Sequence, residues 1–369
     1  MPLFHGGYVL SLVHAYLGLK WYYHILLFIG ALFSTLVLHE MTHLVAFLIK
    51  GYKNEAIILL FMVFYKNSSS KWRLKIDFKM LILGGGLVFT KLGKINNEED
   101  FKKASKATAF SLIAAPTMTI VSSLVLLFIS LVFFYQNTIL VPLSLYILIF
   151  SLIYTFVSTK ESNQIFGDFV AYKKMKTDKD FAFTATLQYS DEITKYQLDI
   201  MQEYVNTYKN LSFNSKFMTY YLYLLEKNLF NDTEVNLKIY ELTYPYIVND
   251  YSYTRLLKSK HGIEIIQSVI LYASKLGFTD RSIALLDQYI NYLEDKKINS
   301  KYITYITKQT HHLLSLSNES TFINNKKNIT SYGLSFIMNH IPSFINSELE
   351  RNKGFNEFEL SCPVKWEEL

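Results

Sequence analysis

The sequence is poor in sulfur ligands and in charge. Cys362 is its only cysteine, so the chain can form neither an intrachain disulfide nor a CxxC metal site. Charged residues make up only 18% of the 369 residues, whereas 50% are hydrophobic. The net charge of +6 is modest, and no basic cluster is interleaved with aromatic residues. We therefore expect no nucleic-acid partner.

The few charges are unevenly distributed, which predicts an integral membrane domain. Residues 1–158 contain long uncharged runs, while residues 173–369 carry charges throughout. Segments 21–49, 107–135 and 138–158 are each long enough to cross a bilayer as a helix, which takes about 20 residues. Only Gln136 and Asn137 separate the second and third segments, which predicts a tight helical hairpin. The shorter apolar stretch in residues 1–20 indicates an interfacial or partly inserted segment.

The lysines and arginines predict the orientation of this multi-pass protein in the cell membrane. Twelve of them lie between Lys50 and Lys106, whereas the Gln136–Asn137 turn has none. Positive residues favour the cytosolic side of a membrane. We therefore expect residues 50–106 and everything after about residue 159 in the cytosol, and the N-terminus outside.

Residues 55–93 have the pattern of a β-hairpin at the membrane surface. Two runs, 55–65 and 72–93, are rich in β-branched, aromatic and aliphatic residues and are separated by the polar segment 66–70. Both runs are too short to be separate spans. The glycines at 84–86 predict a bend or bulge in the second run.

Residues 176–369 are predicted to form a cytosolic, all-α soluble domain, which follows a membrane-embedded domain at residues 21–175. Apolar residues recur with a helical period, and short polar breaks separate the segments. Helix pairs of this size suggest an antiparallel array, with a tetratricopeptide-like form around residues 268–294, although no strict internal period is visible. The predicted helices are 188–208, 216–228, 234–247, 262–276, 280–293 and 301–316.

The first apolar segment contains the sequence His39-Glu40-Met41-Thr42-His43, an HExxH motif. Residues four apart share one face of a helix, so both imidazoles can reach a single zinc ion. Glu40 lies beside the first ligand, where its carboxylate can act as a general base on water that the metal acidifies. Ionisable groups inside a membrane span are costly and by default functional. The alternative is that they pair with each other or reach the nearby interface.

Catalytic zinc takes three protein ligands and keeps one position open, so a third ligand is needed. Both histidines lie near the predicted cytosolic end of their span, and the third span also ends on that side. Asp168, which follows this span, is the candidate that fits, and Glu161 is the nearest alternative. A solvated helix cap is the other interpretation of Asp168.

With these motifs, residues 30–175 resemble the site-2 protease family of intramembrane zinc metalloproteases. In that family an HExxH helix precedes a surface β-hairpin, a helix opening with Gly-Pro-x-x-Asn, and a helix with the ligand Asp-Gly. This chain has the same order, with Ala115-Pro116-Thr117-Met118-Thr119 in the second position and Gly167-Asp168-Phe169 in the third. The resemblance implies that Asp168 is the third zinc ligand and that Glu40 is the general base.

The chain also departs from the family pattern. Ala115, Thr119 and Phe169 replace the motif glycine, asparagine and glycine. The family's asparagine upstream of the ligand Asp, which is thought to assist oxyanion stabilisation, has only Asn163 as a candidate, at a different spacing. These changes affect the oxyanion-stabilising apparatus rather than the metal site. Pro116, Thr119 and Asn163 are therefore possible supporting residues, and Pro116 alone can also mark a kink or a helix start.

The leading functional hypothesis is a zinc-dependent endopeptidase that cleaves a membrane-associated or membrane-spanning peptide or protein within the lipid bilayer. The predicted hairpin could hold the substrate by strand addition, and the C-terminal helical domain could bind a protein partner. The alternative is a non-proteolytic, membrane-anchored helical scaffold or receptor with a vestigial zinc site. A transporter is poorly supported, because about three spans leave little room for a pore. The sequence does not reveal the substrate.

Overall fold

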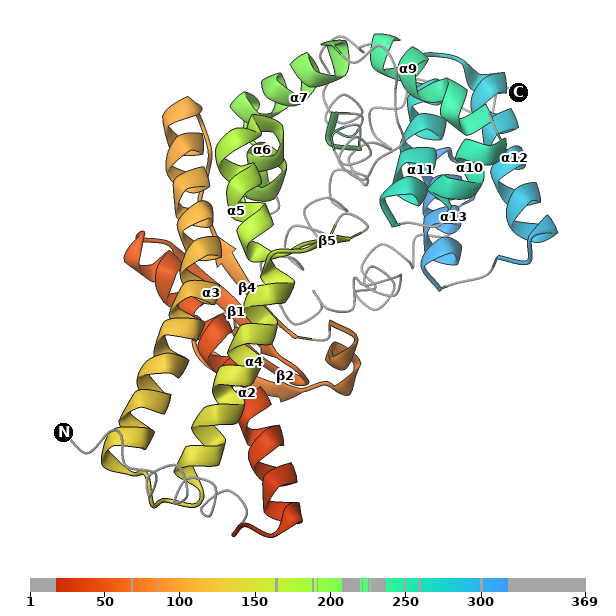
Figure 1. Cartoon of the computed structure of the whole chain (residues 1–369). Coiled ribbons are helices and arrows are strands. Elements are labelled where there is room, and N and C mark those ends of the chain that lie inside the picture. Colours follow the sequence, from red (N-terminus) through yellow and green to blue (C-terminus); the bar gives the residue numbers. More distant parts are fainter. Residues whose placement is uncertain are drawn as a thin grey trace. The chain divides into compact units, whose positions relative to one another are not determined.

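The computed structural model divides into two units, Met1–Asp191 and Glu192–Leu369, and each is described by itself (Figure 1). Asn163, Cys362, the first 17 residues and most of the predicted helix at 216–228 lie outside the described residues. The described residues are 18–67, 69–83, 85–162, 165–187, 189–190, 192–207, 220, 222–224, 226, 237–248, 250–257, 260–298 and 301–317.

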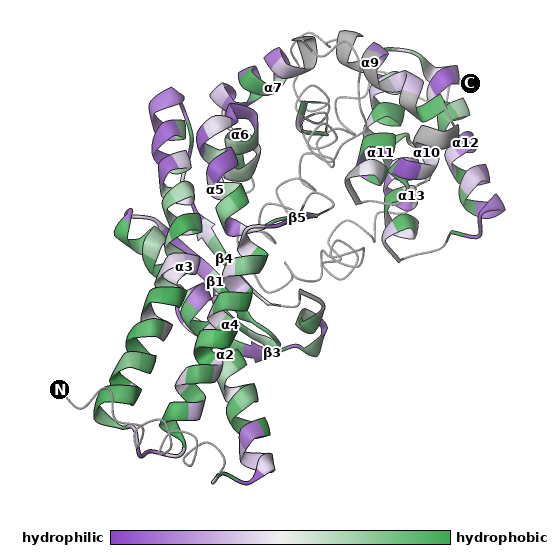
Figure 2. Cartoon of the chain, in the orientation of Figure 1, coloured by the Kyte–Doolittle hydropathy of each residue, from purple (hydrophilic) through white to green (hydrophobic). Residues whose placement is uncertain are grey.

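Three long helices form the first unit's bundle: α2 (Trp21–Ile49), α3 (Glu98–Phe133) and α4 (Leu140–Ser158). Among the described residues, these three are long and apolar enough to cross a membrane. Each packs against the other two, yet large apolar side chains remain on the outside, and Trp21 and Phe133 are 73% and 69% exposed. Figure 2 shows the hydrophobic residues gathered along these helices. Such a surface suits lipid rather than water, so the three predicted spans are confirmed as candidate membrane helices.

The second of these helices is longer than its apolar segment. α3 begins at Glu98, although the sequence pattern predicts a span that starts at residue 107. The Asn97 side chain accepts hydrogen bonds from the backbone N–H groups of Glu99 and Asp100, at 3.0 and 2.9 Å. Acidic residues in the first turn also interact favourably with the helix dipole. The charged residues 98–106 are therefore the first turns of the same helix.

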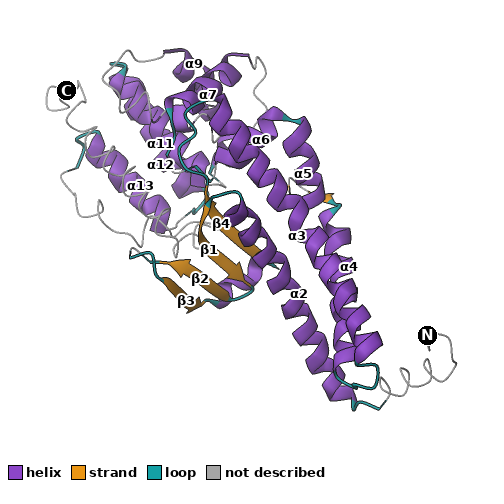
Figure 3. Ribbon diagram, turned by 90° about the vertical axis from the view of Figure 1, so that its left-hand side faces the viewer, coloured by secondary structure: helices purple, strands orange, loops and turns teal. Residues whose placement is uncertain are grey.

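A small antiparallel sheet packs against α2, as Figure 3 shows from the side. Its strands are β1 (Lys53–Leu59), β2 (Met62–Lys66), β3 (Trp72–Ile76) and β4 (Gly86–Lys91), in the order β3-β2-β1-β4. The predicted hairpin is thus a four-stranded sheet in the described part of the chain. The first predicted strand is split by a tight turn at Leu60, which has φ 53°, and the second by a 3-10 helix (Phe78–Leu83). Hydrophobicity does not reveal either break, because both segments are apolar.

A tight connection leads from the bundle to the last two helices of this unit. After α4 come β5 (Glu161–Ser162), β6 (Ile165–Phe166), α5 (Asp168–Thr177) and α6 (Lys179–Leu187). The Gly167 N–H donates a hydrogen bond to the Lys160 carbonyl, at 2.9 Å. Asp168 therefore starts α5 close to the end of α4. Both α5 and α6 pack against α3. The membrane-domain boundary at residue 175 stays a prediction.

The described part of the second unit is helical. Its central helix, α11, contacts α9, α10, α12 and α13, and its residues Ile266, Val269 and Ile270 are buried. The sequence pattern does not predict α10, and the tetratricopeptide-like arrangement stays a prediction. The described helices are α7 (Lys195–Thr207), α9 (Leu237–Val248), α10 (Asp250–Leu256), α11 (Lys260–Lys275), α12 (Thr279–Asp295) and α13 (Lys301–Leu313).

Candidate metal centre and active site

α2 holds the HExxH residues in the interior of the first unit. His39 and Glu40 are only 6% and 7% exposed, although neighbouring apolar residues of α2 face outward. The rings of His39 and His43 have centroids 5.0 Å apart, as expected for residues one helical turn apart. The Tyr154 ring of α4 covers His39, with centroids 5.6 Å apart. The two imidazoles are thus on the same face and are held by packing.

Asp168 lies directly against both histidines. Its Oδ2 is 3.0 Å from His39 Nε2 and 3.5 Å from His43 Nε2. Two ligand atoms in a tetrahedral zinc site are about 3.3 Å apart, since zinc–nitrogen and zinc–oxygen bonds are each about 2.0–2.2 Å. The three ligand atoms all lie within 4.8 Å of one another. These two nitrogens and one oxygen are therefore close enough together that they could hold a metal ion.

The electrostatics of Asp168 favour its ionised form. Burial alone would raise the pKa of this carboxyl group, but hydrogen bonds and charge interactions with His39 and His43 outweigh burial. Together they hold the pKa of Asp168 well below its usual range. The group is a carboxylate at neutral pH, which is the form that binds a metal.

A hydroxyl of α3 orients the first histidine. Thr119 Oγ1 is 3.3 Å from His39 Nδ1 and donates its proton to the Ala115 carbonyl at 2.7 Å. The Thr119 oxygen must then accept a hydrogen bond from His39 Nδ1–H. With Nδ1 occupied by Thr119, Nε2 is the nitrogen of His39 that lies toward Asp168. The residue that replaces the motif asparagine thus contacts a candidate metal ligand.

A second hydroxyl of α3 contacts the other histidine in the same way. Ser111 Oγ is 2.9 Å from His43 Nδ1 and also 3.5 Å from the His43 carbonyl, to which it donates. His43 Nδ1–H then donates to Ser111, and its Nε2 also lies toward Asp168, at 3.5 Å. Such partners of metal-binding histidines set ring orientation and basicity. Sequence reasoning missed Ser111, although a serine within an apolar span about two turns before Thr119 was a usable signal.

The general-base candidate, Glu40, is packed against a glycine of the sheet. A Cβ atom added at Gly86 would be 2.3 Å from Glu40 Cγ and 2.7 Å from its Oε1. Gly86 opens β4 and pairs with Leu59 of β1. The side chain of Glu40 therefore occupies the space that a side chain at position 86 would need. The sequence pattern predicts a bend or bulge at residues 84–86, and the structure has a bend at Gly85 and adds that Gly86 permits the close approach of Glu40.

A tyrosine that no sequence motif singles out also lies near the carboxylates. Burial, together with the negative charges of Glu40 and Asp168, raises the pKa of Tyr189 to about 12. Its phenol therefore stays protonated at neutral pH and can donate a hydrogen bond. Its carbonyl accepts a hydrogen bond from the Leu92 N–H, just beyond β4, at 2.9 Å.

The other predicted site residues are placed as follows. Glu161, the alternative third ligand, instead pairs with Lys174 of α5 at 3.0 Å and is exposed. Pro116 is buried inside α3, so it does not mark a helix start. Phe169 is the second residue of α5. Asn163 lies outside the described residues.

Comparison with known proteins agrees with this geometry. The sequence pattern of peptidase family M50, the site-2 protease family, matches residues 27–315. The chain belongs to peptidase family M50. Members of this family are zinc metallopeptidases, and His39, His43 and Asp168 form a group that could hold a metal. The M50 match extends past residue 175, where the motif resemblance ended, into the second unit. No curated protein and no solved structure matches the chain.

Proposed function

We propose that this M50 member is a zinc endopeptidase that hydrolyses a peptide bond in a membrane-associated or membrane-spanning peptide or protein. The observation that carries this proposal is the zinc-like spacing of His39, His43 and Asp168 beside Glu40, on a helix apolar enough to lie in a bilayer. In this proposal the three residues hold the metal, and Thr119 and Ser111 orient the histidines.

The chemistry divides between the metal and Glu40. Zinc bound there would acidify a water molecule and polarise the substrate carbonyl. Glu40 would take the proton from that water and deliver it to the leaving amine. The side chain of Glu40 is buried where α2 packs against Gly86 of β4, and this packing favours the role of general base because it keeps the carboxylate in one position.

The sheet offers a way to present the substrate to this site. A substrate helix must unwind first, because its carbonyls are hydrogen-bonded internally. Among the described residues, β4 pairs with β1 on one side and with no strand on the other. An extended peptide that added to this free edge would run past Gly86 and so beside Glu40. We propose that substrates bind as an added strand on β4.

The proposed orientation follows from the lysine distribution. We propose that residues 50–106 and the chain after about residue 159 are cytosolic, and that the N-terminus is outside.

The second, helical unit would recruit a protein partner or regulate the access of substrates to the candidate active site. If its helix pairs repeat, it would do so in the manner of a tetratricopeptide domain. The scaffold alternative is not favoured, because it required a vestigial metal site and the candidate ligands are brought together.

Replacement of Glu40 by glutamine tests the proposed reaction. Glu40→Gln keeps the shape of the side chain and removes its ability to accept a proton, so zinc content should be unchanged and cleavage should be lost. We would compare the membrane peptides of cells that express the wild type or the variant, and measure zinc in both purified proteins. Stoichiometric zinc that Asp168→Ala removes would support the metal site. Unchanged cleavage by a zinc-loaded Glu40→Gln variant would refute the assignment.

A further inference from the structure

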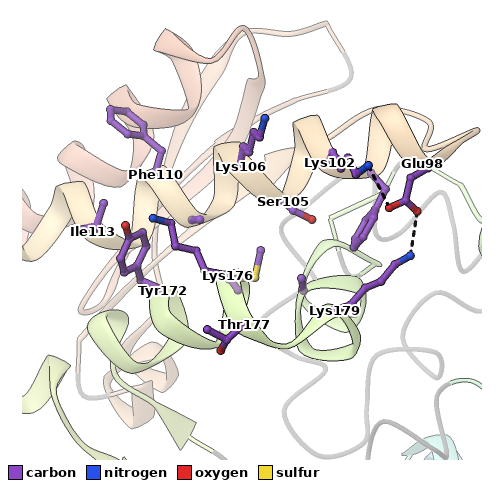
Figure 4. Close-up of a pocket in the computed structure, with 14 residues that line it drawn as sticks. Glu98, Lys102, Ser105, Lys106, Phe110, Ile113, Tyr172, Lys176, Thr177 and Lys179 are labelled. Atoms are coloured by element: carbon purple, nitrogen blue, oxygen red, sulfur yellow. Dashed lines mark hydrogen bonds and ion pairs between the residues drawn. The ribbon is translucent and has the colours of Figure 1, made fainter.

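A second feature of the first unit is a cavity of about 640 Å³ between α3, α5 and α6 (Figure 4). It is separate from the candidate metal centre, since none of its lining residues is a predicted ligand or Glu40. Its walls include the buried side chains of Phe101, Ala109 and Met175. Its size is within the range of sites for small molecules.

The cavity crosses the boundary between the charged and the apolar part of α3. Lys106 is the last charged residue before the uncharged run, and Phe110 and Ile113 lie one and two turns further along. The ammonium group of Lys50, which follows α2, is 4.5 Å from the centroid of the Phe110 ring. If α3 spans a bilayer, this is the level of the lipid headgroups, where lysine and tyrosine side chains concentrate.

The charge of the lining is mostly positive and only partly compensated. At one end of the cavity, Glu98 forms ion pairs with Lys102 at 3.8 Å and with Lys179 at 3.1 Å (Figure 4). In the part of the chain that the structure describes, Lys106 and Lys176 have no acidic partner. Lys176 extends toward α3 above the ring of Tyr172, 4.8 Å from its centroid. The end of the cavity with uncompensated positive charge is thus also the end nearest the apolar residues.

A buried hydroxyl between these two ends lacks a hydrogen-bond partner. Ser105 Oγ lines the cavity, is inaccessible to solvent, and has no partner among the described residues. By contrast, the hydroxyl of Thr108 on the same helix donates to the Ala104 carbonyl at 3.1 Å. A buried, unpaired hydroxyl is unfavourable and calls for an acceptor. Rotation of the Ser105 side chain about χ1 would turn its hydroxyl into the cavity, where an anionic oxygen next to Lys176 would accept the hydrogen bond.

We propose that this cavity binds the phosphate headgroup of an anionic phospholipid. The phosphate would lie between Lys106 and Lys176 and accept a hydrogen bond from Ser105, and an acyl chain would follow Phe110 and Ile113 into the bilayer. Basic pockets at the membrane boundary between helices are suited to anionic headgroups. The proposal rests on the membrane location proposed above but not on peptidase activity.

The test measures lipid binding by the full chain with Glu40→Gln, so that proteolysis plays no part. Native mass spectrometry of the detergent-solubilised protein would be followed during titration with phosphatidylglycerol or phosphatidylcholine. We expect at least tenfold tighter binding of phosphatidylglycerol. Lys106→Gln with Lys176→Gln should weaken it about thirtyfold, since each interfacial lysine contributes roughly fivefold.

A matched control removes the same charge from the same helices outside the cavity. Lys103 of α3 and Lys173 of α5 are exposed and do not line it, so Lys103→Gln with Lys173→Gln should change the affinity less than twofold. Thermal unfolding of each variant would confirm that it is folded. Equal loss in both double variants, or equal affinity for the two lipids, would overturn the proposal. Displacement of phosphatidylglycerol by millimolar inorganic phosphate would also overturn it, because the site would then serve free phosphate.

Discussion

The contact between Gly86 and Glu40 leads to a sharp prediction for the Gly86→Ala variant. The added Cβ would be 2.3 Å from Glu40 Cγ and 2.5 Å from Cδ, whereas ordinary van der Waals contact begins at 3.4 Å. The glutamate must therefore move by about 1 Å, or β4 must move by a similar distance. Movement of the strand is opposed by its pairing with β1, in which Gly86 faces Leu59.

The size of the effect follows from the displacement. A catalytic group that is misplaced by about 1 Å can cost on the order of 100-fold in rate. We expect Gly86→Ala to lower kcat/KM by roughly this factor. Zinc content should not change, because the contact involves Glu40 and none of the candidate ligands. Overpacking of this kind also costs about 1–3 kcal/mol of stability, which would lower Tm by a few degrees.

The assay would use a substrate found by the comparison of membrane peptides with and without Glu40→Gln. Purified variants in detergent would be assayed for cleavage, zinc content and Tm. Gly85→Ala is the matched control, because a Cβ at Gly85 meets nothing within 4 Å, and its activity should stay within about twofold of the wild type. A double variant of Glu40→Gln and Gly86→Ala tests the mechanism, since the second change should cost nothing further if it acts only through Glu40.

Two results would refute this reasoning. The first is a Gly86→Ala protein with full zinc and wild-type kcat/KM, which would show that Glu40 does not need its observed position. The second is equal loss of activity in Gly85→Ala and Gly86→Ala, which would point to the backbone of the strand rather than to the glutamate.

Two further predictions concern the metal site. Gly167→Ala would place a Cβ atom 2.5 Å from two main-chain oxygens at the end of α4. These oxygens cannot move easily, so the adjacent Asp168 must shift, and zinc affinity measured by competition with a chelator should fall at least tenfold. Unchanged affinity would contradict the role of Asp168. Thr119→Val keeps the shape of the side chain but removes the oxygen that contacts His39 Nδ1. Zinc affinity should then fall 10- to 100-fold and be restored by Thr119→Ser, whereas no loss would mean that other contacts hold the His39 ring.

The local features of this protein could be predicted from the sequence because they depend on neighbouring residues alone. A helix places residues four apart on one face, so the spacing of His39 and His43 already implied a shared metal ion. The length of the apolar runs similarly predicted α2, α3 and α4, although not the extension of α3 back to Glu98. The position of Glu40 next to a ligand indicated its chemistry from the motif alone.

The choice between distant residues required the tertiary structure. Asp168 and Glu161 both follow α4, and only the hairpin closed by Gly167 N–H and the Lys160 carbonyl brings Asp168, not Glu161, against the histidines. The contacts of Ser111 with His43 and of Gly86 with Glu40 join residues far apart in the chain. They depend on which faces of packed elements meet, which hydrophobic periodicity does not specify. The sequence by itself determined the candidate metal-binding motif, whereas packing decided the third candidate ligand, the partners of the two histidines and the position of Glu40.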